Sequence, residues 1–334
     1  MHISDHGSQN TAPLPPLLIL TEGDRRRGLG HLGRCLGYAA HWRAEGRPVR
    51  WIVDGDEAAR AVLGAEAVQW RVWQDETGTV DAHGHVVIVD SYDARPQDLA
   101  PLADGARLVV CLDDLERDGY PPGLVVHSAP GPLDRSGRAA RWLIGPAWQP
   151  MPPAFWRVPE RPPARPVLGR VLVLTGGTDL RNLGPGLAGL VRGRLPQARI
   201  DVVLGAGAAA TPFPDGVILH RNLAPEALRD LMLACDAAVS AAGQTLFQLA
   251  RCGAPTIMVG VAGNQARHLR EWPRTGAMTS AGDWDAPGLH DRIAAHLEAL
   301  ASPDLRAAMS RCGQAAVDGQ GVARLAREVR GSLA

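Results

Sequence analysis

A glycine-rich segment that contains a histidine carries the clearest catalytic signal in this sequence. Gly28-Leu29-Gly30-His31 lies between a short apolar run and a long amphipathic stretch, and Arg34 follows about one helical turn later. Glycines let the backbone turn tightly and approach a ligand closely. A histidine at a helix N-terminus meets the positive end of the helix dipole, which disfavours its protonated form and suits a general base. The segment predicts that His31 accepts a proton; the alternative is a histidine that only caps a turn.

A second segment offers groups that could hold phosphate. Gly243, Gln244 and Thr245 follow an apolar run that ends in small residues, and Gln248 comes about one turn later. Free backbone amides at the start of a helix bind phosphate groups. The segment predicts a diphosphate at 243–245 with a ribose hydroxyl near Gln248. The alternative is a plain strand–turn–helix connection that Thr245 caps.

Further polar segments each follow an apolar run. Asn264 and Gln265 offer both donors and acceptors, as sugar hydroxyls require, although this pair is also common as a helix cap. Residues 175–179 predict a second wall of the phosphate site, and residues 90–93 and 113–114 bring carboxylates and a phenol. The arginines at 25–27 form either a solvated loop or part of the diphosphate site.

The elements that position these segments form two series of short apolar runs separated by helical stretches. The first series predicts strands at 17–20, 49–53, 86–89, 108–112 and 124–126, and the second at 171–174, 200–204, 217–219, 237–240 and 256–259. Continuously apolar strands that alternate with helices indicate parallel sheets covered on both faces. Ligands bind beyond the carboxyl ends of such strands. The sequence therefore predicts an α/β protein with two doubly wound, Rossmann-like domains that face a cleft.

A proline-rich segment separates the two series. The stretch 145–166 contains eight prolines, which exclude an ordinary helix or a central strand. We therefore expect a disordered tail at 1–13, an N-terminal domain at 14–148 that provides the base, a linker at 149–167, and a C-terminal domain at 168–334 that contains the phosphate site. The helical stretch 289–333 closes the C-terminal domain.

Composition excludes several classes of function. The 334 residues are 46% hydrophobic and 21% charged, which is typical of globular proteins, and 35 basic residues balance 35 acidic ones. A net charge of zero argues against nonspecific binding to nucleic acid or to an anionic membrane. All the basic residues are arginine, which excludes Schiff-base lysine chemistry and a P-loop lysine.

The five cysteines and the N-terminus indicate the compartment. The cysteines are widely spaced without a C-x-x-C pair, so we expect free thiols and neither a zinc site nor disulfides. We find no signal peptide and no apolar stretch of membrane-spanning length. These features predict a cytoplasmic protein without a membrane anchor or a nucleic-acid partner; they do not indicate its oligomeric state.

The motifs, taken in order, resemble those of one enzyme family. They are similar to the PseG branch of the GT-B proteins, which are nucleotide-sugar hydrolases related to the MurG-type N-acetylglucosaminyltransferases. The resemblance runs from about residue 17 to about residue 269. The matching motifs are G-x-G-H-x-x-R at 28–34, D-S-Y at 90–92, the aspartate pair at 113–114, L-x-G-P at 143–146, G-G-x-D at 176–179, and S-x-x-G-x-T at 240–245 with the later N-Q.

The resemblance implies a GT-B fold, a nucleotide-diphosphate sugar as donor, and neither a cofactor nor a metal. It makes His31 the general base for in-line attack at the anomeric carbon. Substrate contacts are implied for Gly28, Gly30, Arg34, Tyr92, Asp113, Asn264 and Gln265. Nucleotide contacts are implied for Gly176, Gly177, Asn222, Leu223, Gly243, Gln244, Thr245 and Gln248.

Three hypotheses remain for the function. The preferred one is inverting glycosyltransfer to a small acceptor, because Gln248 stands where the hydrolases have a glutamate and Gly243-Gln244-Thr245 departs from their usual G-S-T. The second is hydrolysis of a nucleotide sugar, with water as the nucleophile. The third is a noncatalytic nucleotide-sugar binder, which the presence of His31 in its motif disfavours.

Overall fold

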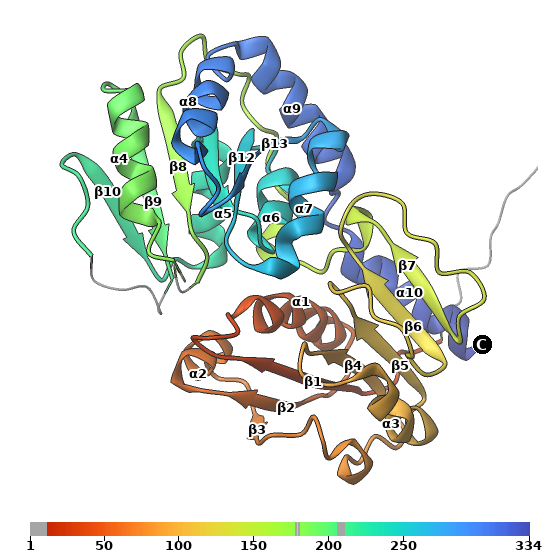
Figure 1. Ribbon diagram of the computed structural model, residues 1–334. Helices are drawn as coiled ribbons and strands as arrows, with labels where there is room; N and C mark the ends of the chain where they lie inside the picture. Colours follow the sequence, from red (N-terminus) through yellow and green to blue (C-terminus); the bar gives the residue numbers. More distant parts are fainter. Residues whose placement is uncertain (1–11, 178, 180, 206–210) are drawn as a thin grey trace, which may run out of the picture.

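The protein consists of two parallel sheets with helices on both faces, one sheet in each half of the chain (Figure 1). The computed structural model describes residues 12–177, 179, 181–205 and 211–334. Most of the predicted disordered tail, residues 1–11, lies outside the described residues, as does Thr178 of the predicted phosphate wall. The two doubly wound domains predicted from the alternating pattern are confirmed.

The first sheet contains seven strands in its described part, all of them parallel to their neighbours. Its spatial order is β3 (Val68–Trp70), β2 (Val49–Gly55), β1 (Leu17–Gly23), β4 (Val86–Asp90), β5 (Leu108–Leu112), β6 (Gly123–His127) and β7 (Ala140–Ile144). Its helices are α1 (Gly30–Ala44), α2 (Glu57–Leu63) and α3 (Ala100–Gly105). Every residue of β1 is buried, as expected for a central strand covered on both faces.

The second sheet has six parallel strands within the described ranges. Its spatial order is β10 (Val217–Arg221), β9 (Arg199–Leu204), β8 (Arg170–Leu174), β11 (Ala237–Ala241), β12 (Thr256–Gly260) and β13 (Met278–Asp283). Its helices are α4 (Gly184–Arg194), α5 (Pro225–Ala234), α6 (Thr245–Arg251), α7 (Ala266–Glu271), α8 (Leu289–Ala299) and α9 (Pro303–Ala316). In both sheets the strand order reverses beside the first strand of the domain, which creates the crevice where such folds bind ligands.

The strands that the sequence pattern missed are β3, β7 and β13, which all lie at sheet edges. An edge strand is covered less completely than a central one, so its sequence lacks the continuous apolar run that revealed the others. In β7, for example, exposed Arg141 and half-buried Trp142 separate buried Ala140 from buried Leu143. Every predicted strand is present, although several extend by one or more residues.

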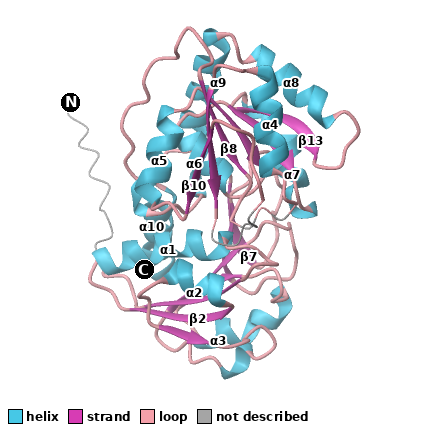
Figure 2. Ribbon diagram, turned by 90° about the vertical axis from the view of Figure 1, so that its left-hand side faces the viewer, coloured by secondary structure: helices cyan, strands magenta, loops and turns pink. Residues whose placement is uncertain are grey.

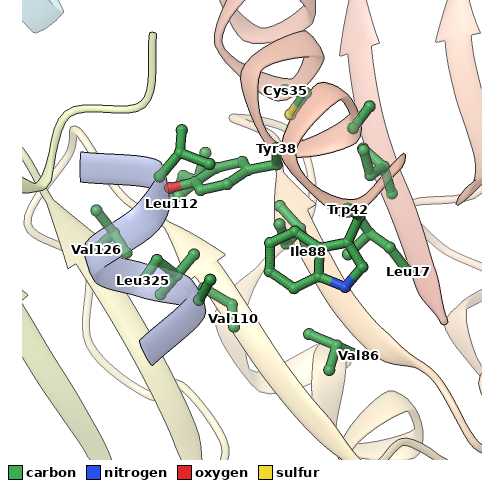
Figure 3. Close-up of a cluster of buried hydrophobic side chains, with 14 of the residues drawn as sticks. Leu17, Cys35, Tyr38, Trp42, Val86, Ile88, Val110, Leu112, Val126 and Leu325 are labelled. Atoms are coloured by element: carbon green, nitrogen blue, oxygen red, sulfur yellow. The ribbon is translucent and has the colours of Figure 1, made fainter. Parts of the chain in front are cut away.

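One apolar core joins distant parts of the chain. Tyr38 and Trp42 of α1 lie fully buried over β1, β4 and β5, and Leu325 of α10 (Gly321–Leu333) packs beside them (Figure 3). The predicted boundaries placed α10 in the C-terminal domain, but its buried face packs on the first sheet. Figure 1 shows this helix, in blue, beneath β5–β7 of the first domain.

The proline-rich segment is fixed to both domains by its packing. Met151 and Phe155 are buried in the core of the second domain, and Trp148 packs against that of the first. The Arg251 Nε atom donates to the Phe155 carbonyl at 3.1 Å. Within the proline-rich stretch 145–166, the prolines allow only short 3₁₀ turns, at Pro146–Trp148 and Pro153–Phe155.

Candidate active site in the interdomain cleft

A cleft of about 200 Å³ lies between the domains, at the carboxyl ends of the strands. The side view in Figure 2 shows the two sheets on opposite sides of this region. The cleft brings together twelve of the predicted site residues. They are Gly28, Gly30, His31, Arg34, Tyr92, Gly176, Gly177, Gly243, Gln244, Thr245, Asn264 and Gln265.

His31 is the second residue of α1, where the sequence predicted the start of a helix. Its ring is 4% exposed, and its Nδ1 atom lies 2.5 Å from Oδ1 of Asp90, the last residue of β4. Burial alone would raise the pKa of Asp90, but Arg34 and His31 lower it far below its ordinary value, so Asp90 is a carboxylate that can only accept. In the neutral imidazole the proton is therefore on Nδ1 and the lone pair is on Nε2, which has no hydrogen-bond partner in the described chain.

Arg34 connects two carboxylates from neighbouring strands. Its Nε atom donates to Asp90 Oδ2 at 2.6 Å, and its Nη1 atom donates to both oxygens of Asp114 at 2.9 and 3.0 Å. Burial would lower the pKa of Arg34, but Asp114 and Asp90 raise it well above its usual range. The Arg34 guanidinium fixes the positions of both carboxylates, because its N–H donors lie in one rigid plane.

Asp114 accepts hydrogen bonds from both domains. Its Oδ2 atom accepts from the Tyr92 hydroxyl at 3.0 Å and from Gln244 Nε2 at 3.2 Å across the cleft. The Asn264 Nδ2 atom donates to the same Tyr92 oxygen at 3.0 Å. Gln149, in the linker, donates to Gln244 Oε1 at 3.0 Å. The Gln244 amide of the second domain therefore donates a hydrogen bond to the Asp114 carboxylate of the first domain.

The opposite wall of the cleft is made of neutral groups. The backbone amides of Gly243, Gln244 and Thr245, at the start of α6, have no hydrogen-bond partner in the described chain, whereas the next two amides donate to the carbonyls of Gly243 and Gln244. Gly176 adopts a positive φ of 87°, which a glycine tolerates best, directly after β8. Among the described residues, the buried Oγ1 atom of Thr175 beside it has no hydrogen-bond partner. This wall presents donors without a compensating negative charge, as a diphosphate site requires.

A second histidine lines the same cleft. His268 lies on α7, one turn after Asn264, and its Nδ1 atom accepts from the indole Nε1 of Trp272 at 3.0 Å. Burial lowers the pKa of His268 to about 4, so the ring is neutral at physiological pH. Because the indole nitrogen can only donate, the proton of His268 is on Nε2. His268 therefore offers a donor where His31 offers an acceptor.

The sequence left two roles open for the arginines at 25–27, a solvated loop or part of the diphosphate site, and the structure has features of both. Arg26 and Arg27 line the cleft, but the Arg27 guanidinium already contacts Asp24, Asp54 and Asp93 at 2.7 to 3.0 Å. Its charge is therefore matched by carboxylates of its own domain. These contacts hold the loop that precedes Gly28.

Four predicted residues do not line the cleft. The Asp113 carboxylate caps the following turn, accepting from the Leu115 and Arg117 amides at 2.9 and 2.8 Å, and Asp114 reaches the cleft instead. Asn222, Leu223 and Gln248 also lie outside its lining. Their nucleotide roles stay predictions.

Sequence reasoning did not assign site roles to Asp90, Asp114, Gln149 or His268. Asp90 and Asp114 were visible in their motifs, and His268 follows Asn264 by four residues, which is one turn of a helix. Nothing in the linker pattern indicated that Gln149 would reach Gln244. Within the described ranges, no three His, Cys, Asp or Glu side chains are grouped so that they could hold a metal ion.

No family model matches the chain, and no curated protein sequence matches it. Solved structures do match over most of the chain. Acinetobacter baumannii MurG is 13% identical with a TM-score of 0.63, over 95% of this chain and 100% of that one. The spinosyn rhamnosyltransferase SpnG, complexed with thymidine diphosphate, is 15% identical with a TM-score of 0.60, over 93% and 99%.

The calicheamicin glycosyltransferase CalG4 is 15% identical with a TM-score of 0.59, over 96% of this chain and 99% of that one. At these identities the likeness establishes the fold, which is the GT-B fold. The described residues contain no helix that is long and apolar enough to cross a membrane.

Proposed function

We propose that this protein is a glycosyltransferase that moves a sugar from a nucleoside diphosphate to a small acceptor, with inversion at the anomeric carbon. The observation that carries the proposal is that His31, whose ring is held from behind by the buried Asp90, and the start of α6 line one cleft. A base and an anion site are the two components that this reaction needs.

The chemistry follows from the two walls of the cleft. The acceptor hydroxyl gives its proton to His31 Nε2 while its oxygen attacks the anomeric carbon. The bond from that carbon to the phosphate oxygen breaks, and the nucleoside diphosphate leaves with the electron pair. The free amides at the start of α6 stabilise the departing charge, so neither a metal nor another cofactor is needed.

Two structures of one similar enzyme support both substrate classes. SpnG is described in complex with thymidine diphosphate and, separately, with spinosyn aglycone. By analogy, the donor of this protein is a nucleoside-diphosphate sugar and its acceptor is a small molecule. The analogy rests on the shared fold, so the residues of the site carry the rest of the argument.

Hydrolysis of the nucleotide sugar is a second candidate, favoured by the hydrogen bonds that cross the cleft. The Gln244–Asp114 and Asn264–Tyr92 contacts join the two walls of the cleft, and the Tyr92 ring packs edge-on against His31 with 4.2 Å between the ring centroids, which limits the room beside the base. Water needs far less room than a sugar or an aglycone. In this reading His31 removes a proton from water instead of from an acceptor.

A panel of UDP-, dTDP-, GDP-, ADP- and CDP-sugars without acceptor tests the proposal. Tight binding of one donor with almost no turnover, followed by transfer once acceptors are supplied, supports the transferase. Release of free sugar and nucleoside diphosphate at enzymatic rates without acceptor replaces it with the hydrolase. If no nucleotide sugar binds, both are wrong.

A further inference from the structure

A second cavity lies on the opposite edge of the second domain. It has a volume of about 550 Å³ and is bordered by linker residues 160–165, the end of α5, and α9. Asp236 and Pro255, which directly precede β11 and β12, form its floor, whereas the active-site cleft lies past the other ends of these strands. A five-residue strand spans roughly 15 Å, so the two sites are separate.

Positive charge dominates this cavity. Its lining contains Arg161, Arg165, Arg306 and Arg311 against only Glu160 and Asp236. The Arg161 guanidinium donates to the Met232 and Cys252 carbonyls at 2.8 and 3.1 Å and to the Cys235 carbonyl, and none of these carries a charge.

Arg306 is the feature that the fold itself does not explain. It is 2% exposed, and its buried Nε atom has no partner in the described residues. Its Nη2 atom donates to the Arg165 carbonyl at 2.6 Å, and its Nη1 atom forms an ion pair with Asp236 Oδ1 at 3.7 Å, which is beyond hydrogen-bond distance. The other oxygen of Asp236 accepts the amides of Gly169 and Arg170 at 2.9 and 2.8 Å. A buried cation without a bonded carboxylate is costly, so an anion in the cavity would offset that cost.

Other polar groups converge on the same cavity. Ser310 and Gln314 follow Arg306 at four-residue intervals and therefore share one face of α9. Gly253 has a positive φ of 64°, and a Cβ placed there would lie 2.4 Å from Ser310 Oγ, 3.1 Å from Gln314 Cδ and 3.2 Å from Arg161 Cδ. Neither the Ser310 nor the Gln314 side chain has a hydrogen bond to the described part of the chain. Together they provide hydroxyl and amide donors beside a cationic group.

We propose that this cavity binds the phosphate group of a small soluble anion. Guanidinium, hydroxyl and amide donors together match the acceptor oxygens of a phosphate. The cavity is larger than a single phosphate needs, so a phosphate monoester uses it more fully than the free ion does. The proposal is independent of the chemistry in the cleft.

The test is a binding titration of the full chain with inorganic phosphate and with glycerol 1-phosphate. Hydrogen-exchange mass spectrometry then locates the ligand. We expect slower exchange in α9 on ligand addition, and tighter binding of the monoester than of phosphate. Equal affinities indicate that the free ion is the ligand, which keeps the site and overturns the preference for a monoester. Protection confined to residues 241–246 assigns the phosphate to the cleft and overturns the proposal.

Two variants separate the role of charge from that of folding. Arg306→Met keeps the buried stem of the side chain and should weaken binding at least tenfold, as expected for losing a charged hydrogen-bond donor. The double variant S310A/Q314A removes only neutral donors and should weaken binding severalfold even if Arg306→Met folds poorly. Arg327→Ala on the exposed face of α10 is the control. If both cavity variants bind phosphate as the control does, the proposal is wrong.

Discussion

Two histidines line the same cleft, and their partners give them opposite chemistry. The Nδ1 atom of His31 faces a buried carboxylate, whereas that of His268 faces an indole N–H. A carboxylate accepts a hydrogen bond from Nδ1–H, so the lone pair of the neutral ring is on Nε2. An indole N–H donates to Nδ1, so the proton of the neutral ring is on Nε2. Under the proposed function, His31 of the first domain is the base, and His268 of the second domain presents a neutral donor. The hydrogen-bond neighbour of a histidine therefore decides which ring nitrogen can accept a proton more directly than the position of the histidine in the fold does.

The largest effect is expected for His31, the histidine that faces the Asp90 carboxylate. Replacing His31 by alanine should lower turnover on the order of 10³- to 10⁴-fold, because no other group in the described cleft takes the proton. Affinity for the nucleotide should stay within severalfold, as the α6 amides are unchanged. Steady-state rates and calorimetric titration measure both quantities. A variant with normal turnover would remove His31 from the mechanism and leave a nucleotide-sugar binder as the simplest function.

The second prediction concerns His268, the histidine that burial keeps neutral. The pKa of His268 is about 4 in the folded protein, below the ordinary 6.5, so the unfolded chain binds a proton more readily between these values. Stability is unaffected above pH 6.5 and falls by ~3 kcal/mol as the pH drops to 4. In His268→Gln, this part of the acid destabilisation should be absent in urea unfolding curves recorded across that range.

An exposed histidine serves as the control for that experiment. His83→Gln should reproduce the wild-type stability profile. If His268→Gln loses stability with falling pH as steeply as the wild type does, His268 is not held neutral.

The third effect tests the carboxylate that distinguishes the two histidines. Asp90→Asn should lower kcat by roughly 10²-fold, because a neutral amide no longer fixes the Nδ1 proton. The donor KM should change by only a few fold. Asp118→Asn, at an exposed ion pair, is the matched control. Thermal melts must show that the Asp90 variant is folded, since Arg34 loses one of its two carboxylates. An unchanged kcat would mean that the pairing is only structural.

The smallest effect tests the contact between the two walls. Gln244→Leu removes the hydrogen bonds to Asp114 and Gln149 and should weaken donor binding about tenfold with little change in kcat. Exposed Gln69→Leu is the control. A loss confined to kcat would instead place Gln244 in the chemical step.

The fold and the position of His31 could be predicted from the sequence, but the place of His268 in the cleft could not. Continuous apolar runs revealed the central strands, and the G-x-G-H segment placed His31 at the start of a helix. His268 was missed because a histidine on a short helix gives no signal until its neighbour is known. Trp272 lies on the next turn, but which nitrogen it contacts depends on side-chain geometry. Asp113 was chosen over Asp114 because adjacent residues at a strand end point to different sides, and periodicity does not say which one caps the turn.

The packing of α10 on the first sheet also has a consequence for the order of events during synthesis. Residues 321–333 complete the core around Tyr38 and Trp42, yet the ribosome makes them after the entire second domain. The first domain therefore leaves the ribosome with an incomplete core, and about 180 further residues must be made before α10 is available, which takes roughly ten to forty seconds at ordinary rates of synthesis. During that interval its apolar face is open to chaperones, and the second domain can fold before the first is complete. Nascent chains stalled before residue 321 should accordingly show protease resistance in the second domain and sensitivity in the first.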